Sequence, residues 1–159
     1  DNAARLQAMD AGKIDATILS SPFDIFGAKK GYKVLLWTRD HVPLTQNAVV
    51  VTDKKLKQSP DQVKRMIKGS IEGLRFIRDH QEESVAIAAK WLRMDPAITR
   101  AAFENYLPCY SADGGLSDQA LRDLIQYELD RGPAKKEIPL SQVASRDLLV
   151  QAQKELNLR

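Results

Sequence analysis

The sequence predicts an α/β fold, with helices and strands alternating in the first third of the chain and helices alone in the rest. Three short runs rich in β-branched and apolar residues stand among helix-forming segments in residues 1–52. Later in the chain, apolar residues recur at spacings of three and four, the pattern of an amphipathic helix. The composition agrees with a globular domain: 43% of the 159 residues are hydrophobic and 28% are charged, which excludes disordered and collagen-like chains.

The three apolar runs are expected to form strands. Residues 14–19 (IDATIL) are almost free of polar interruption, which is typical of a buried strand, and residues 32–38 and 47–52 repeat the pattern. A helix-forming segment separates the first two runs. This order predicts a parallel sheet with a right-handed crossover.

Two helices are expected in this first third. Helix-forming residues run from Ala3 to Ala11 and stop at Gly12, a residue type that often follows a helix. Ser21 then stands where a helix N-cap would, with Pro22 at the first helical position, and that helix should end at Gly31.

Five more helices are expected between residues 59 and 156. The first opens at Ser59 and carries a stripe of apolar residues on one face: Val63, Ile67, Ile71, Leu74 and Ile77. The others should cover residues 82–92, 95–106, 117–132 and 145–156, with a turn at 113–115 and a surface linker at 133–139.

Charge and cysteine content exclude several classes of function. The 24 basic and 21 acidic residues leave a net charge of +3, and the basic residues are scattered, so we expect no nucleic-acid partner. The single cysteine, Cys109, excludes an intrachain disulfide, and His41 and His80 are far apart, so we expect no metal and no cofactor. No motif marks a nucleophile, so we expect no catalytic residue and no enzymatic activity.

The order of motifs resembles one protein family. The run from Leu6 to Pro22 (LQAMDAGKIDATILSSP) and the run from Lys29 to Leu35 (KKGYKVL) are similar to a segment of extracytoplasmic solute-binding proteins of the NMT1/THI5-like group. These proteins serve ABC importers of nitrate, sulfonates, taurine and pyrimidine precursors. Residues 50–53, 59–65, 113–117 and 139–149 resemble motifs in the same family's C-terminal half.

The resemblance implies a partial periplasmic-binding-protein type II-like fold. Residues 1–36 would close the second lobe, residues 37–46 would form the hinge crossing, and residues 47–159 would form the helix-rich C-terminal part of the first lobe. The implied function is that of a solute-binding component of an ABC importer, or a fragment of one. It would capture a small polar or anionic molecule in the cleft between the lobes, in the periplasm or another extracytoplasmic space.

The implied partners are a small ligand and the membrane permease of the importer. The ligand would be nitrate, a sulfonate, an aromatic acid or a pyrimidine-like molecule. Because half of a two-lobed fold would expose apolar surface and strand edges, we also expect a homodimer or a swapped assembly of this chain.

The best candidate ligand site consists of Ser20, Ser21, Pro22 and Phe23. A strand that ends in serines before a helix offers hydroxyls and free backbone N–H groups to one polar ligand. The alternative is that Ser21 only caps its own helix. Asp24 counts against a fully anionic ligand if it faces the site, because like charges repel.

Further candidates for the ligand site are Trp37, Gln46 and Asn47, at the two ends of the predicted hinge. A core role for Trp37 and a strand-edge role for Asn47 are the alternatives. The aromatic pair Tyr106 and Tyr110 could stack on a planar ligand or pack between helices.

Two other functions stay open. Binding-protein lobes also serve as sensor or interaction modules of signalling proteins. A eukaryotic branch of the same family consists of pyrimidine-precursor synthases, but it carries a cysteine-rich iron-binding motif that this chain, with Cys109 alone, does not have.

Overall fold

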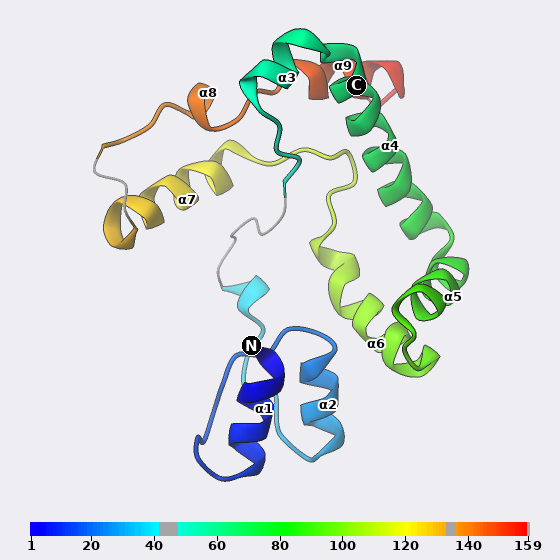
Figure 1. The fold of residues 1–159 in the computed structure, drawn as a ribbon, viewed down its shortest axis with the longest axis vertical. Helices are drawn as coiled ribbons and strands as arrows, with labels where there is room; N and C mark the ends of the chain where they lie inside the picture. Colours follow the sequence, from blue (N-terminus) through cyan, green and yellow to red (C-terminus); the bar gives the residue numbers. More distant parts are fainter. Residues whose placement is uncertain (42–47, 133–135, 159) are drawn as a thin grey trace. The chain divides into compact units, whose positions relative to one another are not determined.

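The computed structural model describes residues 1–41, 48–132 and 136–158, and its regular structure is entirely helical (Figure 1). Helices make up 66% of this part of the chain, and it contains no strand. The α/β fold expected from the sequence, and with it the periplasmic-binding-protein type II-like architecture, is therefore wrong for the described residues.

The three predicted strands fail because none of them has a neighbour to pair with. Residues 14–19, 32–37 and 48–52 lack helical structure, yet no backbone–backbone hydrogen bond joins any of them to another such segment within the described residues. Asn47 lies outside those residues, and Thr38 instead begins the 3₁₀ helix η1 (Thr38–Asp40). A strand is stable only when its N–H and C=O groups are shared with another strand, so β-propensity alone produced no sheet.

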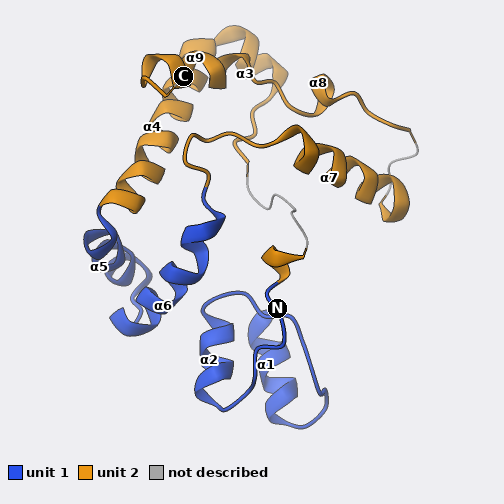
Figure 2. Ribbon diagram, turned by 180° about the vertical axis from the view of Figure 1, so that it is seen from behind, with its two compact units in different colours: residues 1–37, 80–110 blue, residues 38–79, 111–159 orange. Residues whose placement is uncertain are grey.

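The chain divides into two compact units, shown in different colours in Figure 2. Unit 1 comprises Asp1–Trp37 and His80–Tyr110, and unit 2 comprises Thr38–Asp79 and Ser111–Arg159. The boundaries expected from the resemblance, at residues 36 and 47, stay a prediction.

Unit 1 contains four α-helices and a 3₁₀ turn: α1 (Asn2–Asp10), α2 (Phe23–Lys29), α5 (Gln81–Leu92), α6 (Pro96–Tyr106) and η2 (Leu107–Cys109). Helix α1 packs on α2, α2 on α6, and α5 on α6. The Asp95 side chain caps α6 at the predicted start of this helix, because its Oδ1 accepts hydrogen bonds from the N–H groups of Ala97 (2.9 Å) and Ile98 (3.1 Å).

A glycine brings the first two helices together. Gly27 in α2 is buried, and a Cβ atom there would meet side-chain atoms of Leu19, Tyr32 and Leu6 at 3.6, 3.7 and 3.8 Å. These apolar side chains therefore form a small core under α1 and α2. Tyr32 is fixed further by its hydroxyl, which donates to Asp10 Oδ1 at 2.9 Å.

The described residues of unit 2 form η1 and five α-helices: α3 (Asp53–Gln58), α4 (Pro60–Asp79), α7 (Asp118–Arg131), α8 (Leu140–Val143) and α9 (Asp147–Glu155). The sequence predicted α4, α7 and α9 and missed the short helices α3 and α8. Ser117 caps α7 at the predicted start of this helix, because its Oγ accepts a hydrogen bond from the Ala120 N–H at 3.1 Å.

The main packing in unit 2 is that of α4 on α9. Val63 and Ile71, from the predicted apolar stripe of α4, are buried, whereas the other members of the stripe are only partly covered. At the rim, the Glu155 carboxylate accepts from Lys64 Nζ at 2.7 Å and from Lys68 Nζ at 2.9 Å. These two cations lower the pKa of Glu155.

The predicted turn at residues 113–115 packs against the same two helices. Gly114 has a φ of +74°, and a Cβ atom there would lie 2.9 Å from Ile71 Cγ1. Gln153 of α9 is fully buried, and its Nε2 donates to the backbone oxygen and to Oδ2 of Asp113 at 3.0 and 3.1 Å. The turn is thereby anchored to both α4 and α9.

None of the helices in the described ranges is long and apolar enough to cross a bilayer.

Candidate ligand-binding site

Two segments that the sequence singled out separately meet in unit 1. Asn105, near the end of α6, donates from Nδ2 to Ser21 Oγ at 3.2 Å and to Asp24 Oδ2 at 2.9 Å. The Tyr106 hydroxyl donates to the backbone oxygen of Ser21 at 3.3 Å. We call Ser21, Asp24, Asn105 and Tyr106 the Ser21–Asn105 cluster.

The local structure explains why Ser21 is available to this cluster. The residue at the N-cap of α2 is Pro22, which has no side chain that can accept a capping hydrogen bond. Ser21 comes directly before Pro22, to which a cis peptide bond joins it, and its hydroxyl accepts a hydrogen bond from Asn105 of α6 and caps no N–H group of α2. The interpretation of Ser21 as a simple helix cap is therefore wrong.

The two oxygens of the Asp24 carboxylate have different surroundings. Oδ2 accepts the hydrogen bond from Asn105, whereas Oδ1 is buried and has no hydrogen-bond partner among the described residues. A buried carboxylate oxygen without a donor is costly, and most such atoms in proteins are paired. Asp24 Oδ1 is therefore an acceptor that an N–H or O–H group of a water molecule or a ligand would satisfy.

Tyr106 is held in its protonated form. Burial raises the pKa of the Tyr106 phenol, and the nearby Asp24 charge raises it further, with smaller contributions from Tyr110 and Cys109. The phenol thus stays a hydrogen-bond donor and presents an aromatic ring beside the Asp24 carboxylate. The aromatic group noted in the sequence, Tyr106 with Tyr110, lies at this end of α6.

The other residues that the sequence suggested for the site are Ser20, Phe23, Trp37, Gln46 and Asn47. The exposed Ser20 uses its N–H to bind Asn2 Oδ1 at 3.3 Å, and Phe23 packs edge-on against Phe26, with ring centroids 5.8 Å apart. Trp37 is partly buried. Gln46 and Asn47 lie outside the described residues.

Asn105 is the functional candidate that sequence reasoning missed. It stands 84 residues from Ser21 along the chain, in the polar tail of an amphipathic helix, where an asparagine carries no distinctive signal. Its neighbour Tyr106 is an aromatic candidate in the sequence, and this was the signal that could have drawn attention to the end of α6. Among the residues that the structure describes, no three His, Cys, Asp or Glu side chains are grouped so that they could hold a metal ion.

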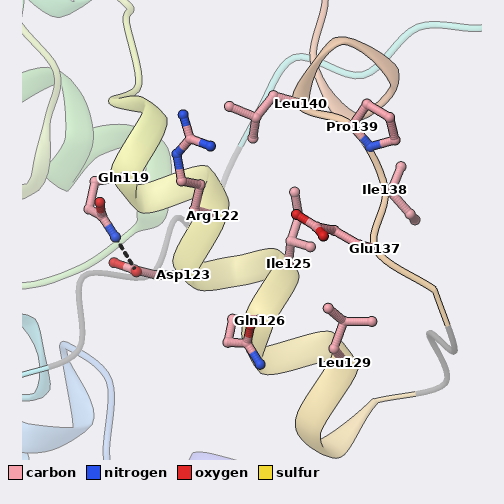
Figure 3. Close-up of a pocket in the computed structure, with 10 residues that line it drawn as sticks. All are labelled: Gln119, Arg122, Asp123, Ile125, Gln126, Leu129, Glu137, Ile138, Pro139 and Leu140. Carbon is pink, nitrogen blue, oxygen red and sulfur yellow. Dashed lines mark hydrogen bonds between the residues drawn. The ribbon is translucent and has the colours of Figure 1, made fainter.

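Unit 2 contains a separate cavity of about 430 Å³ (Figure 3). Figure 3 shows side chains of α7 facing the segment from Glu137 to Leu140. Most of its polar side chains are exposed to solvent (Gln119, Arg122, Gln126 and Glu137), and Asp123 is half-buried. A ligand there would gain little from burial, so the Ser21–Asn105 cluster is the stronger candidate site.

Comparison of the chain with protein-family models, with curated proteins and with solved structures finds no match in any of the three. The resemblance to solute-binding proteins therefore stays a prediction.

Proposed function

We propose that this chain is a non-catalytic solute-binding component of an importer, or a fragment of one, and that it holds its solute at the Ser21–Asn105 cluster. The observation that supports this proposal is the buried Asp24 Oδ1, which has no hydrogen-bond partner in the described part of the chain. The motif order of the sequence supports the importer role. The proposal does not use the two-lobed cleft, because that fold was not found.

The chemistry of the cluster favours a ligand that donates hydrogen bonds. A carboxylate accepts and cannot donate, and its negative charge repels anions such as nitrate or a sulfonate. A pyrimidine that carries an amino group supplies an N–H donor for Asp24 Oδ1 and a flat ring for contact with Tyr106. Of the ligand classes expected from the sequence, the pyrimidine-like class therefore fits best.

The extracytoplasmic location and the docking to a permease are proposals that depend on the motif resemblance. Fractionation of the source cells, with antibody detection of the native protein, tests the location. Co-purification with a membrane permease tests the partner.

Ligand binding is tested by calorimetry and thermal shift with aminopyrimidines, nitrate and taurine. We expect an aminopyrimidine to bind and D24N to weaken its binding about tenfold or more, because a hydrogen bond to a charged group contributes roughly 1.5–3 kcal/mol. The matched control is E83Q, which makes the same chemical change at an exposed residue of α5 in the same unit. Binding of nitrate or taurine alone, or equal loss of affinity in D24N and E83Q, would contradict the proposal.

A further inference from the structure

One extended segment of unit 1 is both apolar and uncovered. Val34, Leu35 and Leu36 are 49%, 82% and 59% exposed. From Lys33 to Leu36, no backbone N–H or C=O group makes a backbone hydrogen bond with a described residue. Such a segment has the exposed edge on which another strand can pair.

We propose that two copies of this chain associate by antiparallel pairing of Lys33–Trp37 about a two-fold axis at Leu35. Leu35 then lies opposite Leu35 of the second copy, and Val34 lies opposite Leu36. This inference does not depend on the proposed ligand or on the importer role.

The register follows from the charge of Lys33 and from the contacts of Tyr32. A two-fold axis at Lys33 would place two lysines directly opposite each other, which is destabilising. An axis at Val34 would recruit Tyr32, but the Tyr32 N–H already donates to Gly27 O at 3.1 Å and its hydroxyl to Asp10 at 2.9 Å. An axis at Leu35 separates the two Lys33 side chains and leaves Tyr32 in its own unit.

A second copy suits this edge because the segment is complementary to itself in that register. Every central pair is apolar against apolar, and a net charge of +3 causes only weak repulsion between copies. Residues 14–19 are less suitable, because Asp15 lies in that run and the Ile18 carbonyl already accepts from Arg5 Nη1 at 3.0 Å. The surface that a five-residue pairing buries is smaller than the roughly 1,200 Å² buried in a stable interface. The dimer should therefore be weak and concentration-dependent.

Single cysteines test the register in the full chain, with Cys109 removed by C109S. Facing Cα atoms of antiparallel strands lie about 4.5–5.5 Å apart, within the range that a disulfide spans. We expect L35C to form a disulfide-linked dimer under mild oxidation. The matched controls V34C and L36C should dimerise poorly alone and should cross-link to each other when mixed.

Sedimentation velocity over a concentration series measures the association itself. We expect L35K to abolish the dimer and V50K to retain it, because Val50 is equally exposed, at 86%, in another extended segment. A chain that stays monomeric up to millimolar concentration would overturn the proposal. Equal cross-linking at all three cysteine positions, which indicates non-specific aggregation or a different partner strand, would overturn it as well.

Discussion

At the scale of single residues, the chemistry of the candidate site depends on one carboxylate and one phenol. Asp24 Oδ2 accepts a hydrogen bond from Asn105, whereas the buried Oδ1 has no hydrogen-bond partner in the described residues. Burial raises the pKa of Tyr106, and the nearby Asp24 charge raises it further. The two groups are therefore coupled, and a change in one should be measurable at the other.

We expect Tyr106 to ionise above the ordinary tyrosine value of 10.0. A phenol whose pKa is raised by folding stabilises the protein fully below its unfolded pKa, and this stabilisation is lost as the pH rises through the folded pKa. Ultraviolet absorbance of tyrosinate should show two late-titrating phenols, because the hydrogen bond to Asp10 also raises the pKa of Tyr32, and Y106F should remove the Tyr106 component alone. D24N should move that component to lower pH; an unchanged component in D24N would contradict the contact with Asp24.

Gly114 allows a direct test of close packing. We expect G114A to destabilise the protein by about 2–4 kcal/mol, because alanine disfavours a positive φ and its Cβ would meet Ile71. The control is G69A, in the middle of α4 with open space around it, which should stabilise the protein by up to about 1 kcal/mol. Urea unfolding measures both, and equal effects of the two variants would contradict the packing of the turn on α4.

At the scale of elements, α9 is held to the turn at residue 113 by one buried amide. Gln153 donates to Asp113, while its Oε1 is buried without a partner in the described residues. We expect Q153E to cost about 3 kcal/mol or more at neutral pH, because it buries a carboxylate beside another carboxylate. The loss should shrink in acid, where the new group is protonated.

Q151E is the matched control for this substitution. Gln151 lies on the same helix and is exposed, so the same added charge should change stability little. Both variants are compared by urea unfolding at neutral and acid pH. A Q153E variant as stable as Q151E at neutral pH would show that α9 does not bury this side chain.

Sequence reasoning succeeded for elements whose signals are local and failed for those that need distant partners. Three helices carry local signals that residues close together in the sequence supply: Asp95 caps α6, Ser117 caps α7, and α4 has an apolar stripe. Each of these helices forms. The strands failed because pairing depends on a second segment, which residues 14–19 and 32–37 do not have in the described chain. In the same way, Ser21 was found from the sequence whereas Asn105, 84 residues away, was not.

At the scale of the whole molecule, few hydrophobic side chains are buried in the described residues, although 43% of the sequence is hydrophobic. Seven hydrophobic residues are buried within the described ranges: Leu6, Val63, Ile71, Val85, Ala89, Leu121 and Ala152. Two of them are alanines, which contribute little area. Burial of apolar surface is the main source of stability, so helices α4 and α9 should be the most stable part and the extended segments the least.

Hydrogen exchange measures this difference along the chain. At low protein concentration, we expect amides in residues 14–19, 33–36 and 48–52 to exchange quickly, because they donate to no backbone acceptor in the described residues, while those of α4 and α9 are protected. Raising the concentration should slow exchange in residues 33–36 alone, as pairing between copies requires. Protection of residues 14–19 together with 33–36 at low concentration would instead mean that these segments pair within one chain, and it would restore the sheet that the sequence predicted.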